Sequence, residues 1–470
     1  MQTLRKTRIV ATIGPASNQP DVLEKLILAG VDVFRVNLSH GTHQDHAQAI
    51  QNIRSVSTKL DQPVGILADL CGPKIRVGKF PEGGIDIAAG ETVTITTRDV
   101  EGGPGLIVSQ YRELHRDLKP GDRILFDDGL MEAKVIDVHG QDLRIRVEYG
   151  GRLKNGKGMN LPGSRLSVAA LTDKDREDAK FAVKNGVDYI ALSFVRRPED
   201  IEALRELITE EGATTPIIAK IEKPEALERI DAIVDTADGL MVARGDLGVE
   251  LPLERVPIVQ RDLVLRARAQ SKPVIVATQM LESMIQNPRP TRAEVSDATT
   301  AVIMGTDAVM LSAETAVGLY PVQAVEMLHR IAIEAEQWQK SLPQSPDPVL
   351  HGAQKSLLRL AVARATMQLA RDLSVGAVVV RSQGGRSARV VSSTRPLAPV
   401  IALTTSMETV RRLRLHRGVV PCLVGPEEFN QPRPAARELT RRLGLAAPGE
   451  YILLLAGFGR EEPTLTAMPV

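Results

Sequence analysis

Eight short aliphatic runs, each of strand length, recur up to residue 311 and alternate with stretches of helical periodicity. The runs are Ile9–Ile13, Val31–Leu38, Val64–Leu70, Tyr189–Phe194, Ile217–Ile221, Gly239–Val242, Val274–Ala277 and Ala308–Leu311. Runs without polar alternation suit strands that are buried on both faces, as in a parallel sheet. Helical patterns such as Asp21–Leu28, Pro198–Ile208 and Pro224–Val234 separate them. Eight strands with intervening helices predict an α/β fold of the (β/α)8 TIM-barrel type, with an open doubly wound sheet as the alternative.

An insert of about one hundred residues separates the third run from the fourth. Four of its segments alternate apolar and polar residues with period two, namely Glu91–Thr97, Arg123–Phe126, Glu132–Val138 and Leu143–Glu148. With its glycine-rich turns, this pattern predicts a small separate β domain, a β-barrel over residues 73–167. Because the insert leaves the barrel after a strand, it emerges at the catalytic face, where we expect it to act as a lid.

A proline-rich linker, Leu342–Pro348, precedes a second α/β pattern. Strands are expected at Ala377–Arg381, Val400–Leu403, Cys422–Val424 and, last, Tyr451–Leu455, with helices at Ser356–Leu373, up to Ser393 and at Met407–Leu415. This order predicts a third domain of the doubly wound α/β type. We therefore expect a catalytic barrel from residues 1–72 and 168–342, the inserted lid, and a C-terminal regulatory domain over residues 350–470.

Composition excludes several classes of function. The 59 basic and 58 acidic residues nearly balance and aromatics are only 3%, so we expect no nucleic-acid partner. The two cysteines are too far apart to suggest a disulfide framework, which favours a reducing compartment. No apolar run has membrane-spanning length and the stretch after the basic N-terminus is too short for a signal peptide, so we expect no membrane and a cytoplasmic location.

Charged residues follow the fifth and sixth runs directly. Lys220 and Glu222 end the fifth run, and Asp246 lies just past the sixth. The carboxyl ends of barrel strands meet at one face, where such enzymes hold their chemistry. Two carboxylates suit Mg²⁺ or Mn²⁺ rather than Zn²⁺, and Gly245 would let a ligand approach the backbone closely. A surface salt bridge is the alternative role for each carboxylate.

Other strand ends carry matching polar groups. They are Arg35, Asn37 and Ser39 after the second run, Asp69 in the third, Thr278 after the seventh and Ser312 and Glu314 after the eighth. With Arg76 added, these side chains describe a site for phosphate and a metal ion.

Two further patterns imitate known sites. Gly151–Gly158 resembles a phosphate loop, but Gly158 replaces the required Ser or Thr and no helix can follow, so we reject a Walker A site and keep only Lys157 as a phosphate contact. His40, His43 and His46 have helical spacing but lack a matching carboxylate, and we interpret them as the solvated first turn of a helix rather than as metal ligands.

Eight motifs in this order resemble the pyruvate kinase family. They are Asn37–Thr42 (NLSHGT), Gly72–Arg76 (GPKIR), Asn160–Gly163 (NLPG), Lys220–Glu222 (KIE), Ala243–Gly248 (ARGDLG), Ala277–Met284 (ATQMLESM), Pro290–Asp297 (PTRAEVSD) and Ser312–Thr315 (SAET). The resemblance implies transfer of the phosphoryl group of phosphoenolpyruvate to ADP, giving ATP and pyruvate. It also implies a homotetramer.

The resemblance assigns roles to these side chains. Glu222 and Asp246 would hold Mg²⁺ (or Mn²⁺), Lys220 would neutralise the transferring group, and Arg35 and Arg76 would clamp phosphate. The substrate would contact Arg35, Lys220, Arg244, Gly245, Asp246 and Thr278, with the backbone amides at 244–246 receiving its carboxylate. The nucleotide would contact Arg76, Lys157, Asn37 and His40. Thr278 lies near the face where the enolate is protonated, and a relayed water is the expected donor.

The third domain resembles the family's effector domain at one loop. Ser382, Gly384, Gly385, Arg386 and Ser387 follow an expected strand and open an expected helix, so their amides can bind the phosphate of a sugar-phosphate effector. A solvated glycine turn is the alternative. The segment Gly457–Pro463 is shorter than the family's usual effector loop, which favours ribose 5-phosphate or glucose 6-phosphate over fructose 1,6-bisphosphate.

A potential K⁺ cage is formed by Asn37, Ser39, Asp69 and the carbonyl of Leu70. In the K⁺-dependent branch of the family a glutamate stands at the position of Lys74. An ammonium there would act as an internal cation, so the resemblance implies that K⁺ is not required. A surface lysine, with K⁺ still in the cage, is the alternative.

Two other functions remain compatible with these residues. One is a metal-dependent lyase that acts on pyruvate enolates, and the other is a non-catalytic sensor of sugar phosphates. Dependence of turnover on ADP separates the first from a kinase, and any turnover excludes the second.

Overall fold

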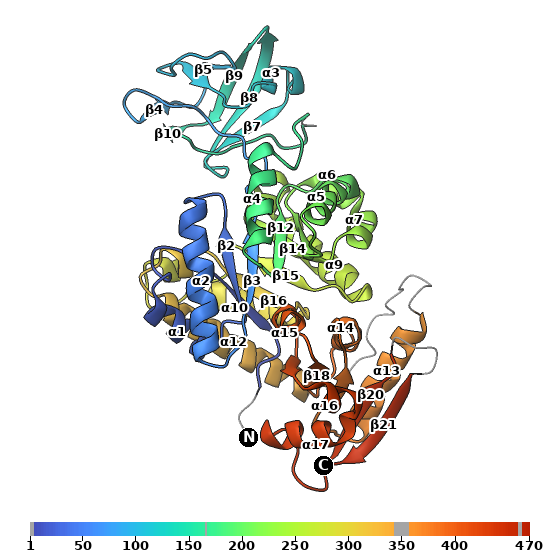
Figure 1. Ribbon diagram of the computed structural model, residues 1–470. Helices are drawn as coiled ribbons and strands as arrows, with labels where there is room; N and C mark the ends of the chain where they lie inside the picture. Colours follow the sequence, from blue (N-terminus) through green and yellow to red (C-terminus); the bar gives the residue numbers. More distant parts are fainter. Residues whose placement is uncertain (1–3, 165–166, 343–356, 459–462) are drawn as a thin grey trace.

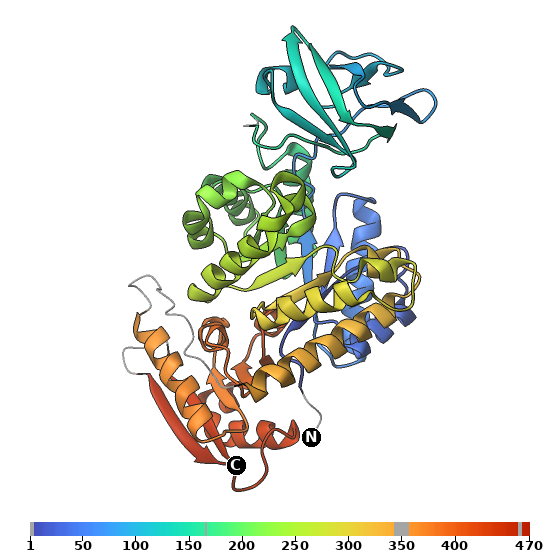
Figure 2. The ribbon, with the colours of Figure 1, turned by 180° about the vertical axis from the view of Figure 1, so that it is seen from behind.

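The chain forms three parts arranged end to end in a computed structural model that describes residues 4–164, 167–342, 357–458 and 463–470. The barrel lies in the middle, the inserted β domain lies beyond one end of it, and the C-terminal domain lies at the other end (Figure 1). The rear view shows the same order, with the N-terminus beside the C-terminal domain (Figure 2). The predicted linker and most of the loop at 457–463 fall outside the described residues.

The barrel is a closed sheet of eight parallel strands in the order β1-β16-β15-β14-β13-β12-β3-β2. Its strands are β1 Arg8–Thr12, β2 Val33–Asn37, β3 Gly65–Asp69, β12 Tyr189–Leu192, β13 Ile217–Ile221, β14 Gly239–Ala243, β15 Val274–Ala277 and β16 Ala308–Leu311. Each falls on one of the eight aliphatic runs, so the predicted TIM barrel is confirmed. The open doubly wound alternative is wrong, because β1 pairs with β16 and closes the sheet.

Period-two alternation along the strands separates two layers of core. Val10 and Ile218 point into the barrel, whereas Ile9 and Ala219 point outward against the helices. Both faces of every strand are thus apolar, which explains why the runs lack polar alternation. Leu415, from the C-terminal domain, completes the inner layer at the far end.

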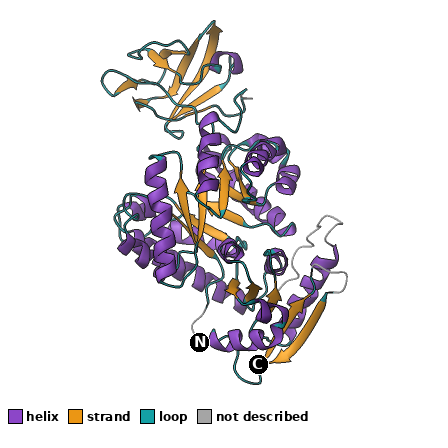
Figure 3. Ribbon diagram, viewed as in Figure 1, coloured by secondary structure: helices purple, strands orange, loops and turns teal. Residues whose placement is uncertain are grey.

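Helices surround the barrel (Figure 3). They are α1 Pro20–Ala29, α2 His43–Lys59, α4 Asp173–Lys184, α5 Pro198–Glu210, α6 Pro224–Glu228, α7 Ile230–Thr236, α8 Arg244–Glu250, α9 Val256–Ala269, α10 Arg292–Ile303, α11 Ala313–Ala316 and α12 Pro321–Ser341, with 3-10 turns at Leu253–Arg255 and Glu282–Ile285. The prediction of one helix over Pro224–Val234 is wrong, because Arg229 leaves helical geometry at φ −119° and ψ 22°. Ala226, Ile230 and Ile233 are all buried, so the apolar spacing continues across the break.

The inserted β domain has its own core. A six-stranded sheet of order β11-β7-β8-β9-β5-β6 curls beside the two-stranded ladder β10-β4. The elements are β4 Gly84–Ile87, β5 Thr92–Thr96, β6 Leu106–Val108, α3 Leu114–Asp117, β7 Arg123–Phe126, β8 Met131–His139, β9 Asp142–Tyr149, β10 Gly151–Lys154 and β11 Met159–Asn160. One cluster of buried aliphatic residues, separate from the barrel core, fills it. The four segments with period-two alternation are strands, which confirms a separate β domain.

The C-terminal domain is a sheet of order β19-β18-β17-β20-β21 with helices packed against it. Its elements are α13 Leu357–Asp372, β17 Val378–Arg381, α14 Arg386–Ser393, β18 Val400–Thr404, α15 Met407–Leu413, β19 Val419–Leu423, α16 Pro426–Asn430, α17 Pro432–Arg442, β20 Tyr451–Ala456 and β21 Thr464–Pro469. The α/β type is confirmed. Two details are wrong: β19 begins at Val419 rather than Cys422, and Tyr451–Ala456 is not the last strand. The last strand, β21, is antiparallel and mostly solvent-facing, so it lacks an aliphatic run.

Three aspartates attach the C-terminal domain to the barrel. Asp32, Asp188 and Asp307 are buried and stand immediately before β2, β12 and β16. Each takes an arginine from the C-terminal domain: Arg414 lies 3.2 Å from Asp32, Arg411 lies 2.8 Å from Asp188 and Arg395 lies 2.7 Å from Asp307. Burial alone would raise the pKa of Asp307, but Arg395 outweighs it and the pKa falls below its usual value. The C-terminal domain therefore sits on the barrel face opposite the predicted catalytic face.

Candidate active site

Lys220 is the centre of the polar cluster at the carboxyl ends of the strands. It is the last residue but one of β13, and its side chain is only 12% exposed. Its Nζ lies 3.2 Å from Asp69 Oδ1 and 3.0 Å from Glu222 Oε1. Nζ also donates to Ser193 Oγ at 2.7 Å. Burial alone would lower the pKa of Lys220, but the two carboxylates outweigh it and raise the pKa above its ordinary value. The ammonium is therefore fully charged at neutral pH and rigidly held.

Asp69 fixes two cations at once. Its Oδ2 accepts from Arg35 Nε at 2.6 Å, while its other oxygen faces Lys220. Burial would raise the pKa of Asp69, yet Lys220 and Arg35 together lower it. Arg35 also donates to Thr12 Oγ1 at 3.2 Å. Two of the three cations predicted to contact the substrate, Arg35 and Lys220, are thus oriented by one buried carboxylate.

Glu222 is a buried carboxylate beside a second acid. Its Oε2 accepts from the backbone amide of Phe194 at 2.7 Å. Burial raises the pKa of Glu222, Lys220 opposes that shift, and Asp246 raises the pKa further. Asp246 lies in the first turn of α8. Two neighbouring carboxylates, one of which is buried, suit a hard divalent cation.

The protein supplies only part of such a metal's ligands. Among the residues that the structure describes, no three His, Cys, Asp or Glu side chains are grouped as metal ligands. Glu222 and Asp246 would therefore leave positions open for water and substrate oxygens, which is how Mg²⁺ is usually bound. The three histidines His40, His43 and His46 are likewise not grouped as metal ligands.

Thr278 follows β15 in a backbone conformation that a β-branched residue rarely adopts, with φ +70°. Its Oγ1 accepts from the Gly245 amide at 2.7 Å and donates to the Ala277 carbonyl at 2.6 Å. The Arg244 guanidinium pairs with Asp297 and donates to the Thr278 carbonyl at 2.7 Å. The predicted substrate contacts Arg244 and Gly245 are therefore engaged with the β15 loop, which they hold in place.

Cations gather around His40 at the mouth of the barrel. His40 is exposed, but the part of its ring that is shielded from water lowers its pKa. The pKa is lowered further by four nearby cations, Arg76, Lys74, Arg35 and Lys174. Arg76 donates to the Gly156 carbonyl at 2.9 Å, and Lys157 pairs with Asp127 at 2.7 Å, both within the insert. These side chains come from the barrel and from the insert, so they form a positive region suited to phosphates.

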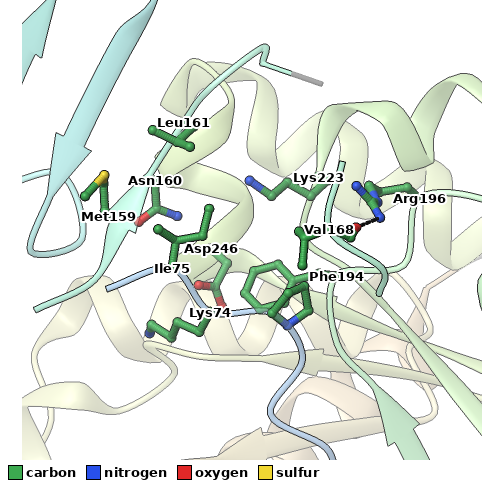
Figure 4. A pocket seen from close by; sticks show the side chains of 11 residues that line it. Lys74, Ile75, Met159, Asn160, Leu161, Val168, Phe194, Arg196, Lys223 and Asp246 are labelled. Atoms are coloured by element: carbon green, nitrogen blue, oxygen red, sulfur yellow. Dashed lines mark hydrogen bonds between the residues drawn. The ribbon is translucent and has the colours of Figure 1, made fainter. Parts of the chain in front are cut away.

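A pocket lies between the barrel and the insert and is lined by residues of both. Lys74, Ile75 and Asn160 line it from the insert side, and Lys223 and Asp246 line it from the barrel, as Figure 4 shows with their neighbours. Asp246, one of the two predicted metal ligands, therefore lines a pocket that the inserted domain also lines.

Three of the four residues of the predicted K⁺ cage already have partners for their cage oxygens. The Leu70 carbonyl accepts from Ser193 Oγ at 2.8 Å, and Asn37 Oδ1 accepts from the Ser39 amide at 3.2 Å. Asp69 faces Arg35 and Lys220. Lys74 is exposed and lines the pocket with Asp246, and the described residues offer it no hydrogen bond or ion pair. The structure therefore brings the cage residues together but does not bring the ammonium of Lys74 among them.

His43 begins α2 and its side chain is 46% exposed, as expected for a solvated first turn, but it also contacts α4. Its Nε2 lies 2.7 Å from Asp178 Oδ1, and its ring stacks on Phe181 at 4.3 Å between centroids. Asp178 belongs to α4, the helix that follows the insert, so the contact could not be read from local spacing.

Two residues at the site escaped the sequence analysis. Ser193 accepts from Lys220 and donates to the Leu70 carbonyl, and Asp175 accepts from the Gly72 amide at 3.0 Å and from Thr172. Gly72 lies just before the insert and Thr172 lies shortly after it, so the buried Asp175 connects the two chain segments that join the insert to the barrel. A serine ending the fourth aliphatic run was an available signal for Ser193, whereas Asp175 resembled an ordinary helix cap.

The predicted effector residues lie together at the start of α14. Ser382 Oγ accepts from the Ala388 amide at 3.2 Å, and Gly385 adopts φ +80°, which a side chain would strain. Arg386 is exposed and Ser387 is half-buried.

Comparison with known proteins gives one consistent result. Residues 4–325 match the family description "Pyruvate kinase, barrel domain", and residues 360–468 match "Pyruvate kinase, alpha/beta domain". Over 458 residues the chain is 45% identical to "Pyruvate kinase 2" of Synechocystis sp., covering 96% of this chain and 76% of that protein. It is 42% identical over 470 residues to "Pyruvate kinase" of Staphylococcus aureus strain MRSA252, covering 99% and 80%. The crystal structure of a pyruvate kinase from Cryptosporidium parvum superposes with a TM-score of 0.90 at 34% identity, covering 99% of this chain and 96% of that one.

Proposed function

The chain belongs to the pyruvate kinase family, and we propose that its phosphoryl transfer is centred on Lys220, held between Asp69, Ser193 and Glu222. It is a phosphotransferase that carries the phosphoryl group of phosphoenolpyruvate to ADP, giving ATP and pyruvate. The observation that supports the role of Lys220 is a buried, fully charged ammonium at the carboxyl end of a barrel strand, where charge develops during transfer.

A coupled pyruvate assay tests this activity. Pyruvate should form only when phosphoenolpyruvate, ADP and Mg²⁺ are all present. Turnover without ADP would instead indicate a lyase that acts on pyruvate enolates, and no turnover at all would indicate a sugar-phosphate sensor.

Phosphoryl transfer of this kind depends mainly on positioning and electrostatics. Lys220 neutralises charge on the equatorial oxygens of the transferring group. Arg35, fixed by Asp69, and Arg76, from the insert side, clamp phosphate with planar donor forks. On the nucleotide side, Lys157, Asn37 and His40 join Arg76 when the insert over residues 73–167 closes as a lid.

Glu222 and Asp246 would hold Mg²⁺ (or Mn²⁺). When bound, the ion neutralises and orients the carboxylate and phosphoryl oxygens of the substrate. Lys220 contacts Glu222, so the ammonium and the metal site share one carboxylate. The amides of Arg244 and Asp246 would receive the substrate carboxylate, while the Gly245 amide between them donates to Thr278 Oγ1.

The enolate that remains must gain a proton at carbon. Thr278 lies beside Gly245, and its hydroxyl is oriented by that amide. We assign it the positioning of a water that gives its proton to the enolate and regains one from solvent, because a threonine hydroxyl alone is a weak acid.

We expect full activity without K⁺. Lys74 would act as the internal cation by turning its long side chain from the pocket beside Asp246 toward the cage of Asn37, Ser39, Asp69 and Leu70. A K⁺ ion about 4 Å from that ammonium would meet a repulsion of about 4 kcal/mol at intermediate dielectric and would be excluded. The rate is measured with Mg²⁺ and a bulky quaternary ammonium salt as the only monovalent cation.

The Lys74→Glu variant should then acquire K⁺ dependence. Lys79→Glu, the same charge change at an exposed lysine five residues away, should not. A large rise in the wild-type rate when K⁺ is added at constant ionic strength would contradict the prediction.

We also expect a phosphorylated sugar to bind the loop of Ser382, Gly384, Gly385, Arg386 and Ser387 and to change the response to phosphoenolpyruvate. A monophosphate such as ribose 5-phosphate or glucose 6-phosphate is the expected effector. Ser387→Glu should abolish the part of the response that depends on this loop through like-charge repulsion, whereas Gln431→Glu, at the N-cap of α17, should leave it unchanged. A response of wild-type size in Ser387→Glu would count against this loop.

Three further assignments follow from family membership. We propose a homotetramer in the cytoplasm, built from the catalytic barrel of residues 1–72 and 168–342, the lid of residues 73–167 and the regulatory domain of residues 350–470. Within the described part of the chain, no helix combines the length and apolarity needed to cross a membrane.

A further inference from the structure

A cavity of about 300 Å³ lies between the barrel and the C-terminal domain, on the side away from the catalytic face. Asp238 and Lys272 line it from the barrel, and Arg359, Arg386 and Arg389 line it from α13 and α14. Helix α14 lies on the barrel-facing side of its domain (Figure 1). Beside the cavity, Ser271 Oγ and Ser393 Oγ are 3.0 Å apart and bridge the two domains.

The cavity carries a strong excess of positive charge. Lys272, Arg359, Arg386 and Arg389 face a single carboxylate, Asp238. That carboxylate is already committed, since it accepts from Arg205 at 3.0 Å and from the Ile217 amide at 2.9 Å. Lys272 donates to the Val234 and Asp235 carbonyls and lies near the Asp235 carboxylate, so the three arginines are the cations of the cavity that have no ion pair among the described residues.

The two arginines of α14 are not held by acids elsewhere. Arg386 and Arg389 lie one helical turn apart on the same face, and the described residues give neither side chain an ion pair. Arg359 is oriented toward the same space by a bond from its Nε to the Phe458 carbonyl at 3.0 Å. Guanidinium groups that share one space and lack acidic partners among the described residues are suited to bind phosphate oxygens.

The electrostatics of the cavity agree with this reading. Burial lowers the pKa of Arg386, and repulsion from Arg359 and Arg389 lowers it further. Burial lowers the pKa of Lys272 to about 8; Asp238 and Asp235 oppose the shift, and Arg205 and Arg389 add to it. An anion in the cavity would remove this unfavourable interaction among cations.

We propose that this cavity binds a small organic phosphate through Lys272, Arg359, Arg386 and Arg389. Its volume is at the lower end of the range for small-molecule sites, which suits a single phosphorylated metabolite. The site differs from the loop of residues 382–387, because it uses side chains that face the barrel rather than loop amides, and only Arg386 belongs to both.

The ligand would bridge the domains next to two catalytic strands. Asp238 stands immediately before β14 and Lys272 stands two residues before β15. These neighbouring strands run straight to Asp246 and Thr278 at the opposite face. A phosphate that fixes both loops against α14 therefore acts on strands that carry the metal carboxylate and the water-positioning threonine, so we expect it to shift the phosphoenolpyruvate concentration that gives half-maximal rate. Only this kinetic consequence rests on the proposed function.

Calorimetric titration of the full chain with ribose 5-phosphate and glucose 6-phosphate tests the site, with ribose, glucose and inorganic phosphate as controls. Arg389→Gln should weaken one binding component about tenfold or more, the scale of a lost charge-assisted contact. Within the described part of the chain the Arg389 side chain makes no hydrogen bond or ion pair, so this variant should fold normally. Arg433→Gln, an exposed arginine on α17, is the matched control and should bind like wild type.

Two further variants locate the site. Arg359→Gln should reproduce the loss from the neighbouring helix, and Ser387→Glu should retain the component that depends on Arg389. An isotherm unchanged by Arg389→Gln and Arg359→Gln would overturn the proposal, as would binding lost only in Ser387→Glu or no binding to wild type. Pyruvate kinase activity without effector should persist in Arg389→Gln, so a failure of the cavity is distinguishable from a failure of the proposed catalytic roles.

Discussion

The Lys220→Ala variant should lose at least about a hundredfold in kcat while its apparent affinity for phosphoenolpyruvate stays within about tenfold of wild type. The reason is that Lys220 stabilises charge that develops during transfer, whereas Arg35 and the metal carboxylates hold the ground-state substrate. Such a division between kcat and KM marks an interaction made mainly in the transition state.

The structure sets the controls for this variant. Removing the ammonium leaves Glu222 without its cation, while Asp69 keeps Arg35. Thermal unfolding should therefore be measured alongside steady-state kinetics to confirm that the variant is folded. Lys25→Ala, at an exposed lysine on α1, should behave like wild type. Equal kcat values for Lys220→Ala and wild type would remove Lys220 from the mechanism.

Glu222→Gln and Asp246→Asn should each raise the Mg²⁺ concentration for half-maximal activity by about tenfold or more, because each removes one of only two anionic ligands. Raising Mg²⁺ should restore part of the rate, which a general loss of structure would not allow. Mg²⁺ titrations of the initial rate at saturating substrates measure the effect.

Control substitutions at exposed acidic residues show whether a change in the Mg²⁺ response comes from losing any carboxylate charge or from losing one at the strand ends. Glu199→Gln on α5 and Asp173→Asn on α4 make the same chemical changes away from the strand ends and should leave the Mg²⁺ response unchanged. If Glu222→Gln and Asp246→Asn both keep the wild-type Mg²⁺ dependence, the metal lies elsewhere.

Most of the barrel strands could be predicted because each one is marked by the residues of its own short segment. Each strand is apolar on both faces, so runs such as Ile217–Ile221 are visible without knowing their neighbours. The break at Arg229 could not be predicted, because the buried positions keep helical spacing on either side of it. The last strand, β21, was missed because most of its side chains face solvent and leave no aliphatic run.

The site was predictable where residues share a strand end and unpredictable where contacts join distant segments. Lys220 and Glu222 are two residues apart, and the barrel geometry implies that Asp246 is near them. The partners that orient them, Ser193 and Asp69, come from other strands, and their hydrogen bonds depend on side-chain placement. The same limit applies to Lys74, whose long side chain can reach several places from one backbone position.

The arginine–aspartate contacts beneath the barrel bear on the order of assembly during synthesis. Domains fold from the N-terminus as the chain emerges, so the barrel is complete before residues 395–414 exist. Among the described residues the ion pair of Asp307 comes from Arg395 alone, so until then its charge must remain hydrated. Asp32 and Asp188 are already paired by Arg8 and Arg54 from the barrel itself. Asp307 is therefore the one of these three aspartates that stays unpaired on the nascent barrel until the C-terminal domain docks and supplies Arg395.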